Sequence, residues 1–126
     1  MRSGKSSMPS VLLVEDEAFL RELVVEILHD AGYHVIEAGD GSAGVDALRS
    51  DLRIDLLLSD IKLPDLDGYT VAQVGKKLHP DLKVILMTGY APSPLPEALQ
   101  SLVYRVLQKP FSLNLLPGLV AAALDA

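Results

Sequence analysis

The stretch D-L-L-L-S-D-I-K-L-P-D-L-D-G, residues 55–68, holds the pattern that decides the fold. Residues 55–59 form a short, mostly apolar run, as expected of a strand that is buried on both faces. Asp60 then begins a polar loop that ends at Gly68, and a helical pattern follows over 69–78. A buried strand, a loop and a helix in this order predict one unit of a parallel α/β sheet.

Similar units recur along the chain. We expect strands at 11–14, 34–38, 55–59, 83–87 and 105–108. Apolar residues at helical spacing run from 20 to 31 and from 116 to 124, and shorter helices are expected at 43–50 and 69–78. This alternation predicts a parallel sheet with helices on both faces, because each parallel crossover needs a covering element.

Length and composition favour one domain and exclude several functions. The chain has 126 residues, 49% of them hydrophobic, and residues 1–9 are interpreted as a flexible tail or linker before a domain at 10–126. The net charge of −6, without a long basic run, argues against direct binding of nucleic acid or an anionic membrane. The chain has no cysteine and no apolar stretch near the roughly 20 residues that span a bilayer, which suits a cytoplasmic protein.

Reactive side chains follow the ends of four predicted strands. E-D-E at 15–17 follows the first strand, Asp60 the third, Thr88 the fourth and Lys109 the fifth. The carboxyl ends of parallel strands meet at one edge of the sheet, where open α/β proteins bind ligands. We therefore expect carboxylates, a hydroxyl and an ammonium group to meet at that edge.

This set of groups indicates a divalent cation and a phosphoryl group. Clustered carboxylates repel one another and need a cation. Mg²⁺ prefers such hard oxygen ligands, and Mn²⁺ would fit almost as well. A carboxylate can itself act as a nucleophile and form an aspartyl phosphate, while the ammonium of Lys109 suits a phosphoryl oxygen.

Four short motifs stand in a specific order and spacing: V-L-L-V-E-D-E at 11–17, S-D-I-K-L-P-D-L-D-G at 59–68, M-T-G-Y at 87–90 and Q-K-P-F at 108–111. Through them the sequence resembles the receiver domain of two-component response regulators, from about residue 9 to the C-terminus. The resemblance implies a flavodoxin-like (βα)5 three-layer sandwich with a parallel five-stranded sheet in the order 2-1-3-4-5.

The resemblance also implies a set of metal ligands. Asp60 corresponds to the phosphoacceptor, and Asp16 to the carboxylate that binds Mg²⁺ directly. Glu15 matches a second acid that usually acts through water, and Lys62 stands where the family contributes a backbone carbonyl oxygen.

Two further residues correspond to the groups that hold the phosphoryl oxygens, the hydroxyl of Thr88 and the amine of Lys109. The Lys109–Pro110 peptide bond is expected to be cis, as in the family. The implied partner is a histidine kinase or a histidine phosphotransfer protein, so the chain is a phosphoacceptor module rather than an enzyme in the ordinary sense.

The amino-acid sequences at 87–90 and 106–111 most resemble those of receivers attached to hybrid histidine kinases. The sequence leaves open whether the chain is a stand-alone regulator or a receiver from a hybrid kinase. The cognate kinase and the oligomeric state are also left open.

Three other functions are compatible with an α/β fold. A receiver-like interaction module that is never phosphorylated is disfavoured, because every expected site residue is present. Phosphatases of the haloacid dehalogenase type usually carry Asp-x-Asp on the first strand, whereas this chain has adjacent Glu15-Asp16. A flavodoxin that binds flavin would need a hydroxyl-rich phosphate loop after the first strand, which this sequence lacks.

The chain departs from the family on the surface that usually carries the output. Val106 stands where an aromatic residue usually precedes the lysine by three positions, and Tyr104 lies two residues earlier. Prolines at 92, 94 and 96 predict a fourth helix that begins late and is short. We therefore expect a remodelled output face, with the signal leaving through a change of order in residues 88–100.

The last helix is also expected to depart from a regular form. Pro117-Gly118 is predicted to interrupt its start, and Ser112 is predicted to cap it.

Overall fold

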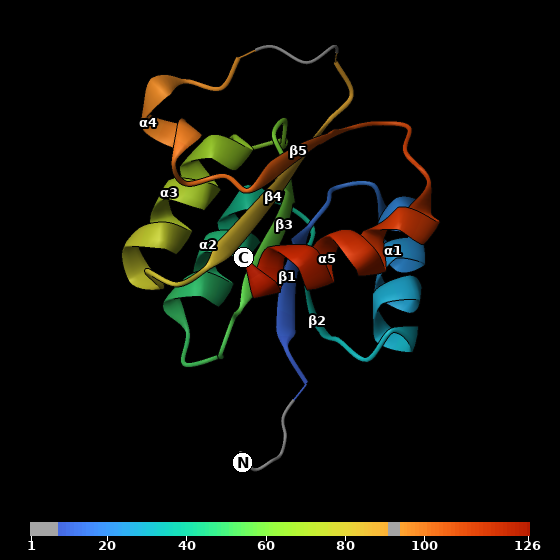
Figure 1. Cartoon of the computed structure of the whole chain (residues 1–126). Helices are drawn as coiled ribbons and strands as arrows, with labels where there is room; N and C mark the ends of the chain where they lie inside the picture. The colour runs from blue at the N-terminus through green and yellow to red at the C-terminus, as the bar shows by residue number, and fades with distance from the viewer. Residues whose placement is uncertain (1–7, 91–93) are drawn as a thin grey trace.

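The computed structural model describes residues 8–90 and 94–126 and has one parallel sheet of five strands with helices around it (Figure 1). In chain order the elements are β1 (Ser10–Val14), α1 (Ala18–Asp30), β2 (His34–Ala38), α2 (Gly41–Arg49), β3 (Leu56–Asp60), α3 (Gly68–Leu78), β4 (Lys83–Thr88), α4 (Glu97–Gln100), β5 (Arg105–Gln108), a short 3-10 helix η1 (Leu113–Leu115) and α5 (Leu116–Asp125). The strand order is β2-β1-β3-β4-β5, so the predicted flavodoxin-like fold is confirmed.

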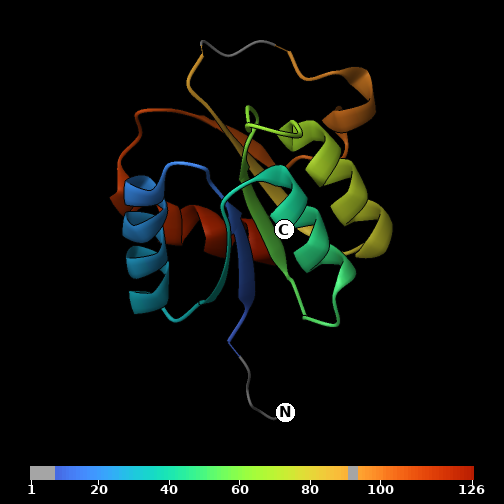
Figure 2. The same ribbon diagram turned by 180° about the vertical axis from the view of Figure 1, so that it is seen from behind.

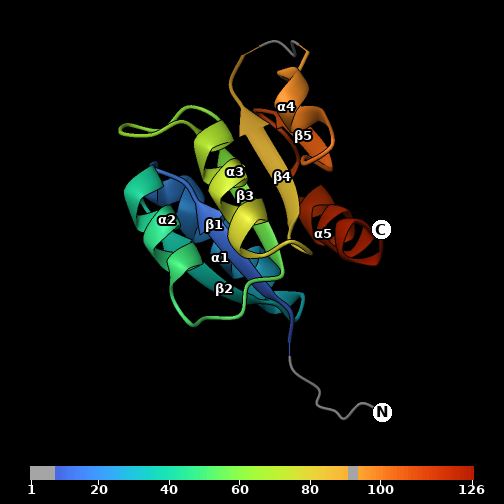
Figure 3. The ribbon, with the colours of Figure 1, turned by 90° about the vertical axis from the view of Figure 1, so that its left-hand side faces the viewer.

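Helices cover both faces of the sheet and give the molecule three layers (Figures 2 and 3). α1 and α5 pack on one face, and α2 and α3 pack on the other. Successive side chains of a strand point to opposite faces, so in β1 Leu12 and Val14 enter one core while Val11 and Leu13 enter the other. A strand buried on both sides must be apolar throughout, which explains the continuous apolar run of β1.

The third strand lies one residue later than predicted. It runs from Leu56 to Asp60, and Asp60 pairs with Met87 of β4. Asp55, expected inside the strand, instead accepts a hydrogen bond at 2.8 Å from the backbone N–H of Ser10. The phosphoacceptor candidate is therefore held by the sheet ladder itself and is not on a loop.

Aspartates before α2 and α3 set where these helices begin. Asp40 accepts a hydrogen bond at 2.8 Å from the N–H of Ala43, and Asp67 accepts one at 2.8 Å from the N–H of Thr70. These side chains satisfy backbone donors that a helix start leaves free. α2 and α3 accordingly start two residues and one residue before the predicted positions 43 and 69, at 41 and 68.

The two predictions for the start of the last helix were wrong. Ser112 makes no side-chain capping bond; its carbonyl instead accepts a hydrogen bond from the N–H of Leu115 in η1. Pro117 does not interrupt α5, because it lies in the first turn, where its missing N–H would have no helical partner.

The fourth helix is short, as predicted. α4 has four residues and begins directly after Pro96. Pro92 and residues 91–93 lie outside the described residues, as do residues 1–7 of the predicted tail. Within the described part of the chain, no helix is both long and apolar enough to cross a lipid bilayer.

Candidate functional site

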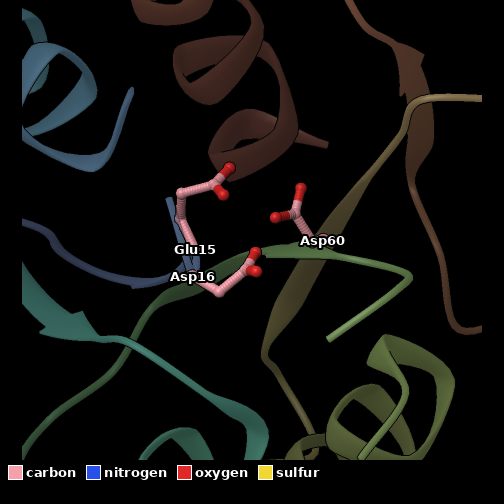
Figure 4. Close-up of side chains that lie close together, drawn as sticks. All are labelled: Glu15, Asp16 and Asp60. Atoms are coloured by element: carbon pink, nitrogen blue, oxygen red, sulfur yellow. The ribbon is translucent and has the colours of Figure 1, made fainter. Parts of the chain in front are cut away.

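The expected side chains meet at the carboxyl edge of the sheet. Asp60 and Thr88 are the last residues of β3 and β4, Glu15 and Asp16 follow β1, and Lys109 follows β5. Figure 4 shows the carboxylates of Glu15, Asp16 and Asp60 pointing into one space. One oxygen from each lies within 4.8 Å of the others. The edge therefore gathers three carboxylates from two strand ends.

Lys109 bridges two of these carboxylates. Its Nζ lies 2.7 Å from Oδ1 of Asp60 and 2.8 Å from Oε1 of Glu15. Its backbone N–H donates to the carbonyl of Thr88 at 2.7 Å, and the Lys109–Pro110 bond is cis. The ammonium group thus places a positive charge between the two buried acids.

Glu15 and Asp16 are adjacent, but they differ sharply in burial and in hydrogen bonding. Glu15 is 1% exposed, and both of its carboxylate oxygens have protein partners: Lys109 for Oε1 and the N–H of Glu17, at 3.0 Å, for Oε2. Asp16 is exposed, and its carboxylate makes no hydrogen bond with the described residues. Only Asp16 thus presents an unengaged carboxylate to the space beside Asp60.

Burial and charge perturb the three ionisable groups inside the site. Burial, together with the nearby Glu15 carboxyl, raises the pKa of Asp60 to about 7, despite the opposing effect of Lys109. Burial also acts to raise the pKa of Glu15, but hydrogen bonds with Asp60, Lys109 and the Glu17 backbone outweigh it and lower that pKa. Burial acts to lower the pKa of Lys109, but the two carboxylates outweigh it and raise that pKa, so the amine stays charged. The site therefore holds more negative charge than Lys109 balances.

The donor set fits a hard divalent cation. Carboxylate oxygens are the ligands that Mg²⁺ prefers, and one oxygen from each of the three carboxylates lies within 4.8 Å of the others, so their repulsion requires more positive charge than Lys109 provides. A cation beside Asp60 and Asp16 would supply that charge. The residues present thus fit Mg²⁺ or Mn²⁺.

A cavity of about 500 Å³ opens beside Asp60. Its walls come from the ends of four strands and the loops that follow them: Asp16, Asp60, Lys62, Leu63, Pro64, Met87, Thr88, Gly89, Tyr90 and Lys109. Oγ1 of Thr88 accepts a hydrogen bond at 3.1 Å from the N–H of Tyr90, which leaves its hydroxyl proton to donate to a ligand. Nζ of Lys62 donates to the Tyr90 hydroxyl at 3.2 Å, so this side chain is engaged at the rim.

A larger cavity of about 660 Å³ lies at the opposite edge of the sheet, among residues such as Ile54, Asp81 and Leu124. Its lysines are already engaged, since Lys76 donates to backbone carbonyls and Lys83 donates to the carbonyl of Ala126. Size alone would favour this cavity, but it lacks the clustered carboxylates, and we assign the chemistry to the smaller one.

The loop between β3 and α3 is tied on both sides. Asp65 accepts hydrogen bonds at 2.8 Å from the N–H groups of Gly41 and Ser42, at the start of α2. The N–H of Gly68 donates to the carbonyl of Ile61 at 2.6 Å. A Cβ at Gly68 would overlap the carbonyl oxygen of Asp60. The loop that carries Lys62 is thus anchored close to Asp60.

Sequence reasoning missed Arg21, whose Nη1 donates to the backbone carbonyl of Glu15 at 2.6 Å. In the sequence it is one charge among several on an amphipathic helix. No spacing rule connects a helical arginine with a carbonyl six residues earlier. Only the path of the chain around the β1–α1 turn reveals the contact.

Val106 and Tyr104, the residues named above for the output face, lie in or beside β5. Val106 is half-buried against the core that includes Leu99 of α4. Tyr104 is 39% exposed, and the guanidinium of Arg105 lies 5.9 Å from the centre of its ring.

Comparison with known proteins gives a consistent answer. The family model for the response regulator receiver domain matches residues 11–121. The response regulator receiver protein CpdR of Brucella abortus is 36% identical over 108 residues, which cover 85% of this chain and 89% of that protein. The sensor kinase CckA of the same organism is 35% identical over 122 residues, which are 95% of this chain but only 13% of the kinase.

Solved structures agree with the sequence relatives. A CheY-like receiver domain from Methanospirillum hungatei superposes with a TM-score of 0.85 at 30% identity and covers 94% of this chain and 95% of that one. The receiver domain of the hybrid histidine kinase CckA gives a TM-score of 0.76 at 31% identity and covers 91% of this chain and 98% of that one. The relatives thus include a protein of similar length and a kinase in which the matched segment is a small part of the whole.

Proposed function

The chain belongs to the response regulator receiver domain family, and we propose that it accepts a phosphoryl group on Asp60 in a reaction that requires Mg²⁺. The observation that carries the proposal is the position of Asp60. It lies 2.7 Å from the Lys109 ammonium and in one group of ligand oxygens with Glu15 and Asp16. This proximity to an ammonium group and to two further carboxylates supports Asp60 as the nucleophile beside a bound cation.

The proposed donor is a phosphohistidine on a kinase or phosphotransfer protein. A carboxylate oxygen of Asp60 bonds to phosphorus as the N–P bond breaks, and the histidine nitrogen leaves with the bonding electron pair. Asp60 and Glu15 raise the pKa of Lys109, so its amine is charged, and this ammonium group then contacts a phosphoryl oxygen. The Thr88 hydroxyl, at the same cavity, donates to another oxygen. These roles are positioning and charge neutralisation, the main needs of phosphoryl transfer.

We propose Asp16, Asp60 and the backbone carbonyl of Lys62 as direct metal ligands. The bound cation would neutralise the phosphoryl oxygens. Both carboxylate oxygens of Glu15 already have protein partners, which supports its indirect role through water. Asp16 has a free carboxylate and Lys62 lines the cavity, which supports their direct roles.

Named relatives support the class of partner. They include the sensor kinase CckA and the sporulation initiation phosphotransferase F of Bacillus subtilis. We propose that this chain serves as the phosphoacceptor in such a relay, in the cytoplasm, without turning over substrates as an enzyme does.

Intact-mass analysis after incubation with acetyl phosphate tests the proposal. We expect one added phosphoryl group on the wild type with Mg²⁺, and none when Mg²⁺ is chelated or in Asp60→Ala. Asp81→Asn is the matched control, since this exposed aspartate lies at the opposite edge and should leave labelling unchanged. An absence of adduct in folded, metal-binding wild type would favour the unphosphorylated interaction module. Steady turnover of a generic phosphate ester would favour the phosphatase.

A further inference from the structure

Arg21 stands outside the residues assigned to metal or phosphoryl binding, yet its side chain reaches back to them. It lies near the start of α1, where its N–H donates to the carbonyl of Glu17 at 2.9 Å. Its Nη1 donates to the carbonyl oxygen of Glu15 at 2.6 Å, and its Nε lies 3.5 Å from Oε1 of Glu37 in β2. One side chain therefore joins the β1–α1 turn to the end of β2.

The peptide group that Arg21 holds is the one that joins Glu15 to Asp16. On the preceding side, the N–H of Glu15 donates to the carbonyl of Ala38 in β2 at 3.0 Å. On the following side, the N–H of Glu17 donates to the Glu15 carboxylate at 3.0 Å. Arg21 supplies the remaining contact. The exposed Asp16 carboxylate has no partner of its own among the described residues, so its direction depends on this backbone.

We propose that Arg21 is a positioning residue for metal binding, which keeps the Asp16 carboxylate turned toward Asp60. The three carboxylates of the site lie within 4.8 Å of one another and repel. A turn released from Arg21 would let Asp16, the exposed member, move away from Asp60 toward water. This inference rests on the proposed function, because it assigns Asp16 to the metal.

A purely electrostatic effect of removing Arg21 would change the metal affinity in the direction opposite to the loss of positioning, so the experiment can distinguish the two. Arg21 carries a positive charge next to an anionic site, so its removal should by charge alone strengthen the binding of a cation. Loss of positioning should weaken that binding. Residues that orient metal ligands without touching the metal typically contribute tenfold or more to affinity.

The experiment is a titration of the whole chain with Mn²⁺, read from the electron paramagnetic resonance signal of the free ion. We expect Arg21→Gln to weaken Mn²⁺ binding roughly tenfold. The maximal rate of phosphorylation at saturating Mg²⁺ should be unchanged, because Arg21 makes no contact with Asp60, Thr88 or Lys109. A higher metal requirement with an unchanged maximal rate is a result that general destabilisation would not produce.

Two matched variants separate the causes. Glu37→Gln removes the outer ion pair but leaves the bond from Arg21 to Glu15, so metal affinity should stay at the wild-type value. Arg49→Gln makes the same change of net charge at an exposed position near the end of α2, and should not weaken binding.

Arg21→Lys keeps the test valid if the glutamine variant does not fold. Its single amine must divide between the Glu15 carbonyl and the Glu37 carboxylate and so holds the Glu15 carbonyl only part of the time, and affinity should fall between wild type and Arg21→Gln. Unchanged or tighter Mn²⁺ binding in the folded Arg21 variants, or a lower maximal rate with unchanged affinity in them, would overturn the inference. Failure of the proposed function would differ, since wild type itself would then take no phosphoryl group.

Discussion

At Asp60, burial and the neighbouring Glu15 carboxyl act together to raise the pKa, and the Lys109 ammonium opposes them only in part. The pKa of Asp60 is raised from 3.8 to about 7, so the folded state binds a proton that the unfolded state has lost between these pH values. Stability from this group is therefore present at low pH and is lost as the pH rises toward 7. We expect Asp60→Asn, without metal at pH 8, to raise the free energy of unfolding by on the order of 1–2 kcal/mol, since coupling to Glu15 and Lys109 reduces the full effect.

Urea denaturation at pH 5 and pH 8, with a chelator present, measures this gain. The difference between variant and wild type should widen as the pH rises. Asp81→Asn, at an exposed aspartate, should show no such trend. If Asp60→Asn were no more stable than wild type at pH 8, the account of an undercompensated buried carboxylate would be wrong.

Gly68 lies in the first turn of α3 and Gly118 in the first turn of α5, and the structure predicts opposite effects of substituting alanine at these two positions. A Cβ at Gly68 of α3 would overlap the carbonyl oxygen of Asp60, whereas a Cβ at Gly118 of α5 would meet no atom within 4 Å. We expect Gly68→Ala to destabilise by about 1–3 kcal/mol, because the end of β3 must shift. Gly118→Ala should stabilise by about 0.5–1 kcal/mol, as alanine usually does in a helix.

Thermal and urea unfolding of both variants check this pair. Gly68→Ala should also slow phosphorylation, because the displaced atom belongs to the acceptor residue itself. A stabilised Gly68→Ala would show that the contact between α3 and β3 relaxes freely.

In the molecule as a whole, the site and the face that we expect to carry the output lie along the same two strands. Thr88 ends β4 at the site, and the chain then continues toward the short α4, whose Leu99 packs in the same core as Val106. No aromatic side chain occupies position 106 to relay movement of Thr88. We therefore predict that phosphorylation changes the order of the segment 88–100, of which the structure describes 88–90 and 94–100.

Amide hydrogen exchange with and without beryllofluoride, a mimic of the phosphoryl group, tests this prediction. Exchange should change in this segment more than in α2, which packs against β1, β2 and α3. Identical exchange in 88–100 with the mimic bound would exclude this output route.

Local sequence determined much of this protein. The strands at 34–38 and 105–108 were predicted with their observed bounds, although they are the edge strands of the sheet and are only partly buried, because turn residues delimit them. The meeting of Glu15, Asp16, Asp60, Thr88 and Lys109 also followed from sequence, because the carboxyl ends of parallel strands share one edge. The start of the last helix was predicted wrongly, because the rule for a serine cap competes with the 3-10 turn that forms instead.

Only the tertiary structure decided which site groups are already engaged. The sequence cannot show that Glu15 is enclosed by Lys109 and Glu17 while Asp16 stays free, since both are acids after the same strand. It also cannot show that Arg21 turns back to the Glu15 carbonyl. Such contacts depend on how β2, α1 and β5 are placed around the carboxyl end of β1. Periodicity specifies which face of each element is buried, but the distances between side chains of different elements arise only when the layers pack.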